Sequence, residues 1–165
     1  MKFEGLKIQV DNLVGHPDRQ RDFSVEGSVG LRFDDAAIDG PVLVEGTVRG
    51  TADGVLARFA ARAEASLSCV RCLTRWTTDF DISASQHFSP VPDEDGYAIV
   101  DGEIEIMGPA RDELALALPP APVCRTACKG LCPICGTDLN TDPCDGHGDD
   151  SDSPFSVLKD LFEPS

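Results

Sequence analysis

The sequence has no apolar run that approaches the roughly eighteen residues of a membrane-spanning helix. Its start, Met-Lys-Phe-Glu-Gly-Leu-Lys-Ile, also lacks the apolar centre of a signal peptide. We therefore expect a cytoplasmic protein without a membrane partner. In a reducing cytoplasm, paired cysteines indicate metal binding or redox chemistry more often than structural disulfides.

Catalytic signatures are missing as well. The sequence contains no Gly-x-Ser-x-Gly elbow, no phosphate-binding glycine loop and no His-Glu-x-x-His helix. We therefore expect a protein that is not an enzyme and has no small-molecule substrate.

Basic residues are scarce: 14 Lys and Arg stand against 29 Asp and Glu, which gives a net charge of −15. Such a chain repels a phosphate backbone at long range, so basic proteins are its natural electrostatic partners. A local RNA contact would have to use the arginines of one hairpin, Arg58, Arg62, Arg71 and Arg75. Alternatively, the acidity serves only to keep the protein soluble.

Cysteines, by contrast, are numerous and clustered. The chain has seven, at Cys69, Cys72, Cys124, Cys128, Cys132, Cys135 and Cys144. Two Cys-x-x-Cys pairs are spaced so that both sulfurs of each pair can reach one ion. A structural zinc ion takes four ligands, with sulfur at about 2.3 Å, so the sequence predicts zinc sites.

Alternating apolar and polar residues predict β-strands in the first 90 residues. The longest alternation covers residues 55–67 and resumes over 76–84. Because Cys69 and Cys72 fall between these segments, we expect them at the tip of a long antiparallel hairpin. The sequence thus predicts an α+β fold, mostly β, with an antiparallel or barrel-like sheet over residues 1–121.

The rest of the chain is organised around the cysteine-rich segment. We expect a helix at 109–118, because Pro109 suits a first helical turn and Pro119 ends a helix. Residues 122–148 should form a zinc knuckle that packs on the 69–72 hairpin tip. Residues 149–165 should form an acidic linker and a short helix, with Ser153 as its N-cap.

Seven cysteines leave one of eight positions open on two zinc ions, and His147 can fill it. The first predicted site joins Cys69 and Cys72 to Cys124 and Cys128. The second consists of Cys132, Cys135, Cys144 and His147. Two alternatives stay open: a single zinc ribbon from Cys69, Cys72, Cys132 and Cys135, and one compact site from Cys128, Cys132, Cys135 and Cys144.

Eight protein ligands leave neither ion an open position, which indicates structural rather than catalytic zinc. The isolated His16 and His87 are expected to be ordinary surface residues. A second class of function is a thiol- or zinc-responsive redox switch, which would release metal and form reversible disulfides under mild oxidant.

Four segments, in this order, resemble the YceD family, the large ribosomal RNA subunit accumulation proteins. They are Cys69-Val-Arg-Cys72-Leu, Asp112-Glu-Leu-Ala-Leu-Ala-Leu-Pro119, Cys128-Lys-Gly-Leu-Cys-Pro-Ile-Cys-Gly-Thr-Asp-Leu-Asn140 and Ser153-Pro-Phe-Ser-Val-Leu-Lys-Asp-Leu161. The resemblance spans most of the chain from the predicted hairpin tip onward. Many relatives carry Cys-x-Cys after the Leu-Asn pair, where this chain has Cys144-Asp-Gly-His147.

The resemblance implies a non-catalytic factor in biogenesis of the large ribosomal subunit, required for large-subunit (23S) rRNA to accumulate. Genes of the family often neighbour that of a small zinc-ribbon protein of the large subunit. Together with the acidity, this implies a basic ribosomal protein or an assembly factor as partner.

Overall fold

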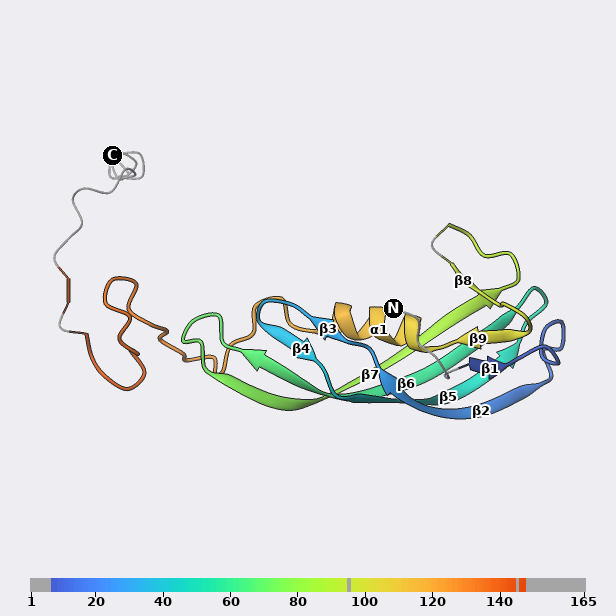
Figure 1. Ribbon diagram of the computed structural model, residues 1–165, viewed down its shortest axis with the longest axis horizontal. Helices are drawn as coiled ribbons and strands as arrows, with labels where there is room; N and C mark the ends of the chain where they lie inside the picture. The colour runs from blue at the N-terminus through green and yellow to red at the C-terminus, as the bar shows by residue number, and fades with distance from the viewer. Residues whose placement is uncertain (1–6, 95, 145, 148–165) are drawn as a thin grey trace, which may run out of the picture.

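The computed structural model describes residues 7–94, 96–144 and 146–147 (Figure 1). Its main sheet has seven strands: β2 (Gln20–Ser28), β3 (Leu31–Arg32), β4 (Ala36–Ile38), β5 (Pro41–Gly50), β6 (Val55–Ser68), β7 (Arg75–Ser89) and β8 (Tyr97–Ala98). A separate pair joins β1 (Lys7–Gln9) to β9 (Glu103–Glu105), and α1 (Met107–Ala117) follows. The predicted mostly β, α+β fold is confirmed.

The long hairpin of β6 and β7 is the main structural element of the sheet. Its register runs from Val55 opposite Phe88 to Ser68 opposite Arg75. Along β6 every second side chain is buried or nearly so, from Val55 to Leu67, which is the predicted alternation. The six residues between the strands form the tip, and they include Cys69 and Cys72.

On its other edge, β6 pairs first with β5 and then, nearer the tip, with the short β4. The sheet curls, and α1 lies over its inner face (Figure 1). The helix buries Met107, Ala110 and Leu114 in the core beneath it, and Pro109 is buried as well. This single layer of helix on one sheet face leaves the outer face of β6 and β7 to solvent.

Several local predictions differ in detail. The helix begins at Met107 rather than at 109, because the buried Met107 extends its apolar face by part of a turn. Strands β2 and β3 are separated at Gly30, which has a φ of 55°. The strand β4 was not predicted, and β8 pairs in parallel with β7.

Helix α1 ends cleanly before two prolines. Leu118 has left the helical region at φ −60° and ψ 135°, as expected for a residue that precedes proline. From there the chain runs past the hairpin tip into the cysteine-rich segment (Figure 1). The predicted C-terminal helix, from Ser153 onward, lies outside the described residues. The proposed boundaries at 121 and 148 stay a prediction.

Candidate metal centres

The hairpin tip is a compact turn around the first cysteine pair. The backbone N–H of Cys69 donates to the carbonyl of Thr74 at 2.9 Å, and that of Leu73 donates to the carbonyl of Cys69 at 2.8 Å. Leu73 has a φ of 60°, a conformation that disfavours side chains with a Cβ. The hydroxyl of Thr74 lies 3.3 Å from the Cys72 sulfur. The turn therefore presents two sulfurs on one side.

The second cysteine pair has the same turn. The N–H of Cys132 donates to the carbonyl of Thr137 at 2.8 Å, and that of Gly136 donates to the carbonyl of Cys132 at 2.9 Å. Gly136 has a φ of 73°, in the place that Leu73 takes in the first turn. The hydroxyl of Thr137 lies 3.1 Å from the sulfur of Cys135. Two copies of one sulfur-presenting turn thus exist in the chain.

The structure brings four cysteines together at the hairpin tip, and we call Cys69, Cys72, Cys124 and Cys128 the proximal cluster. The Cys69 and Cys128 sulfurs are 3.8 Å apart, and those of Cys72 and Cys124 are 3.6 Å apart. All but Cys124 are buried. The four ligand atoms lie within 4.8 Å of one another, so they can hold one metal ion.

Backbone hydrogen bonds hold the tail against the tip on both sides of this cluster. Val70 donates to the carbonyl of Pro122 at 3.0 Å, and Leu131 donates to the carbonyl of Arg71 at 3.0 Å. The Arg71 guanidinium also donates to the carbonyl of Cys128 at 3.0 Å. The proximal cluster therefore lies at the junction between the sheet and the tail.

A second group of four ligand atoms forms what we call the distal cluster: Cys132, Cys135, Cys144 and His147. The sulfur of Cys144 is 3.8 Å from that of Cys135 and 3.7 Å from that of Cys132. The Nε2 atom of His147 is 3.2 Å from the Cys144 sulfur. Only Cys132 is buried, while Cys135 and His147 are exposed, so this group sits at the surface.

The sulfur separations fit a shared ion better than disulfides. All seven cysteines are free, and a disulfide would bring its sulfurs to about 2.05 Å. A tetrahedral ion with bonds of about 2.3 Å to sulfur has sulfur–sulfur edges of about 3.8 Å. The observed distances of 3.6–3.8 Å agree with that geometry. Both clusters therefore have the spacing of metal sites.

Hydrogen bonds lower the pKa of two thiols in each cluster, Cys69 and Cys72 in the proximal one and Cys132 and Cys135 in the distal one. Burial opposes the ionisation of Cys69, but backbone hydrogen bonds from Cys124, Cys72 and Arg71 outweigh it and lower its pKa from 9.0 to about 6. Hydrogen bonds from the side chain and backbone of Thr137 lower the pKa of Cys135 from 9.0 to about 6. Each cluster thus contains a thiolate near neutral pH, which is the form that binds metal.

The two alternative ligand sets are divided by this arrangement. Cys69 and Cys72 of the ribbon set lie in the proximal cluster, whereas Cys132 and Cys135 lie in the distal one. The compact set is likewise split, because Cys128 lies apart from its other three members. Metal ligation by either cluster stays a prediction.

The two remaining histidines lie elsewhere. His87 is near Asp53, with 3.4 Å between Nε2 and the carboxylate, and near the hydroxyl of Thr51. His16 lies in an exposed loop before β2. Neither joins a group of metal-ligating side chains within the described part of the chain.

Asn140 is a site residue that pattern analysis missed. Its side-chain amide donates to the Cys128 sulfur at 3.6 Å and to Asp138 at 2.6 Å. Its side-chain oxygen accepts from the backbone N–H of Lys129 at 2.9 Å. Asn140 therefore ties the loop of the distal cluster to a sulfur of the proximal one.

Trp76 is a second such residue. It packs against the main core and also against the buried cysteines of the hairpin tip. Because it is the only tryptophan in the chain, its fluorescence is a reporter for the proximal cluster.

The hairpin arginines form a weaker basic surface than the sequence indicates. Arg62 lies 3.4 Å from both the Glu45 and the Asp81 carboxylates. Arg71 is engaged with the carbonyl of Cys128. Two of the four predicted cations are therefore already partnered.

Within the described residues, no helix has the length and apolar character needed to cross a membrane.

The fold and site define a class: a curled β-sheet protein with two cysteine-rich groups that can hold metal ions. The family described as "Large ribosomal RNA subunit accumulation protein YceD" matches residues 57–162. The chain belongs to this family, and the predicted membership is confirmed.

The chain is also similar to individual curated proteins. An uncharacterized protein of Mycobacterium leprae is 32% identical over 133 residues, which cover 75% of this chain and 60% of the relative. An uncharacterized protein of Mycobacterium tuberculosis is 31% identical over 126 residues, covering 71% and 60%. The chain thus spans about 60% of the length of these relatives.

A plant relative carries a functional name. The chloroplastic large ribosomal RNA subunit accumulation protein YCED homolog 1 of Arabidopsis thaliana is 36% identical over 61 residues, covering 37% of this chain and 19% of the relative. No solved structure matches the chain.

Proposed function

We propose that this chain is a non-catalytic factor of large ribosomal subunit biogenesis that supports the accumulation of large-subunit (23S) rRNA. The family match over residues 57–162 carries the proposal, since it contains all eight candidate ligands. A cytoplasmic location belongs to the same proposal. The partner would be a basic ribosomal protein or an assembly factor, because the net charge of −15 attracts cationic proteins and repels RNA. Any direct rRNA contact would be local, at the outward arginines of β6 and β7.

We assign two structural zinc ions to the two clusters. Sites with four sulfur or imidazole ligands favour zinc over the harder divalent ions, and tetrahedral geometry suits it. The proximal ion would fasten the tail to the hairpin tip, and the distal ion would close a loop that has few apolar residues of its own. In this role the metal sets the shape that the tail presents to a partner.

The test of the function is a depletion and rescue experiment. We expect depletion to lower large-subunit rRNA relative to small-subunit rRNA and to reduce the large-subunit peak in a sucrose gradient. Wild-type protein should restore both, whereas Cys128→Ser, which lacks a proximal ligand, should not. Normal rRNA and normal subunit profiles after depletion would rule out the proposed function.

A thiol- or zinc-responsive switch is a second candidate, and the exposed distal cluster favours it. Its Cys135 and Cys144 sulfurs are 3.8 Å apart, and Cys135 is exposed. A peroxide would oxidise the two thiols to one disulfide and be reduced to water or alcohol, with release of the bound ion. The assay is zinc release and thiol loss under mild peroxide. Seven thiols that stay protected from alkylation while the ions stay bound would exclude the switch.

A further inference from the structure

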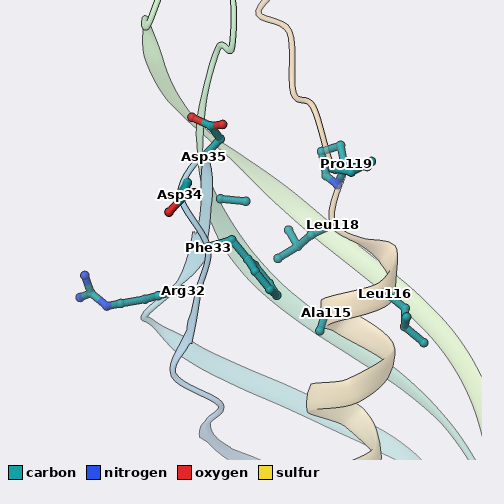
Figure 2. A pocket seen from close by; sticks show the side chains of 10 residues that line it. Arg32, Phe33, Asp34, Asp35, Ala115, Leu116, Leu118 and Pro119 are labelled. Carbon is teal, nitrogen blue, oxygen red and sulfur yellow. The ribbon is translucent and has the colours of Figure 1, made fainter.

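A surface groove lies away from both clusters. It occupies about 660 Å³ between the β3–β4 turn and the C-terminal end of α1 (Figure 2). Figure 2 shows the ring of Phe33 directed toward Ala115 and Leu118, while Arg32 points away from the helix. The floor is apolar, because Ala36 and Leu118 belong to the main core. Two large apolar side chains remain exposed at its rim, Phe33 at 54% and Leu116 at 82%.

One wall of this groove is negatively charged. Asp34 and Asp35 occupy the turn beside Phe33, and neither forms an ion pair with another described residue. Arg32 is the one arginine among the described residues that line the groove, and it is already paired with Asp39 at 3.0 Å. The turn wall therefore has two carboxylates and no cation to offset them.

The opposite wall is negative for a different reason. A helix ends with backbone carbonyls that have no helical partner, and its C-terminus carries partial negative charge. The last turn of α1 has no basic residue to compensate this charge. The two residues that follow Leu118 are Pro119 and Pro120, which have no N–H to donate to those carbonyls. Cations are thus favoured at both walls.

We propose that this groove binds an extended basic segment of a partner protein, with one apolar side chain against Phe33 and lysine or arginine at the two walls. The inference deepens the proposed function, because it names the surface that would hold the basic partner. Charge decides between occupants. A second copy would bring a net charge of −15, and residues 148–165 of the chain itself contain five acidic residues and one basic residue.

The direct test measures binding of defined peptides to the full-length, zinc-loaded chain. The probe is a fluorescein-labelled twelve-residue peptide of lysine and arginine with one central leucine, and a glutamate version serves as its charge control. We expect the basic peptide to bind at low salt and the glutamate peptide not to bind. Phe33→Ala should weaken binding about tenfold, since it removes the aromatic anchor.

Two further variants separate groove binding from general charge attraction. Asp34→Asn combined with Asp35→Asn should weaken binding about threefold and reduce its salt dependence. Val100→Ala is the matched control, because Val100 is 57% exposed and lies outside the groove. It should bind as the wild type does. No binding of the basic peptide, or equal binding by all variants, would overturn the proposal.

A photo-crosslinking amino acid at position 116 identifies the occupant. An adduct with the added peptide supports the proposal, whereas an adduct with the chain's own residues 148–165 or with a second copy overturns it. The outcome is independent of the depletion experiment. Normal subunit profiles after depletion would remove the proposed function and leave peptide binding intact, while loss of peptide specificity would remove only the groove proposal.

Discussion

The two Cys-x-x-Cys turns share one backbone pattern but have different surroundings. In both, the first cysteine accepts and donates backbone hydrogen bonds across the turn, and a threonine hydroxyl lies near the second sulfur. The proximal turn joins strands of 14 and 15 residues, and Cys69 is fully buried. The distal turn lies in a loop, and its second cysteine is exposed.

The comparison distinguishes two contributions to holding the cysteine ligands in place, that of the turn itself and that of the surrounding scaffold. The proximal cysteines are held by a hairpin whose register is set by a continuous ladder, and Trp76 packs against them from the core. The ligand residues of the distal cluster make their hydrogen bonds only within 132–147, among the described residues. An ion at the proximal cluster would therefore connect two parts of the fold, whereas an ion at the distal cluster would order only its own loop.

Two variants that each lack one ligand, one in the proximal and one in the distal cluster, should show the largest difference in stability. Structural zinc contributes on the order of 10–16 kcal/mol in small finger peptides, so loss of the proximal ion should be severe. We expect Cys128→Ser to lower the free energy of unfolding by at least about 3 kcal/mol, or roughly 6–12 °C in Tm. Cys135→Ser should lower the free energy of unfolding of the sheet by less than about 1 kcal/mol, because the distal loop can open without unfolding the sheet.

The measurements are zinc content and thermal unfolding followed by Trp76 fluorescence. Each variant should retain one ion of two, and only Cys128→Ser should change the emission of Trp76 in the folded state. Equal loss of stability in the two variants would contradict the assignment of different roles to the clusters.

When a chelator removes metal from the wild-type chain, the two clusters should release their ions at different rates. With excess EDTA we expect two phases of zinc release, and the faster one should belong to the distal cluster because its ligands are exposed. The slower phase should be at least about tenfold slower and should coincide with the change in Trp76 fluorescence. In Cys135→Ser the fast phase should be absent. A single phase in the wild type would show that the clusters open together.

Much of the sheet could be predicted because the alternation of apolar and polar residues is a local feature of the sequence. Alternation over residues 55–67 and 76–84 identifies the hairpin, and strands of this length leave no ambiguity of period. The strand β4 has three residues, Ala36–Ile38, which is too short for alternation to appear. The pairing of β1 with β9 joins distant segments, and no local pattern encodes it. The strand β8 has only two residues, which is too short for a pattern to show its parallel pairing with β7.

The site was predictable to a lesser extent. Sequence spacing placed Cys69 and Cys72 at the hairpin tip, where the structure has them. The threonines beside the sulfurs, Thr74 and Thr137, could also have been found from the sequence, since both turns have the pattern Cys-x-x-Cys-x-Thr. Asn140 belongs to the family-like motif, but its spacing does not predict its contact with Cys128, which depends on how the loop folds back over Lys129.

Asn140 offers a way to test how far the two clusters depend on each other. Asn140→Ala removes the amide that donates to the Cys128 sulfur and the acceptor for the N–H of Lys129. Partners that orient a metal ligand are worth about 10–100-fold in affinity, so proximal zinc affinity should fall by that factor. Asn140→Asp should bind more weakly still, because it places a carboxylate beside the thiolate. The measurement is competition with a chelator of known zinc affinity, and unchanged affinity in both variants would exclude the coupling.

The smallest effects should come from the residue that has a positive φ in each turn. Gly136→Ala should destabilise the distal loop by about 1 kcal/mol and weaken distal zinc binding about fivefold, because a Cβ disfavours a φ of 73°. Apart from the two neighbouring residues in the chain, no atom of the described residues lies within 4 Å of a Cβ built there, so backbone strain is expected to act. Leu73→Gly relieves the same strain at the proximal turn but gives the unfolded chain more freedom. Its unfolding free energy should therefore change by less than about 0.5 kcal/mol. Thermal unfolding of the zinc-loaded proteins and chelator competition measure the pair, and a larger effect at Leu73 than at Gly136 would show that the two turns do not share one backbone requirement.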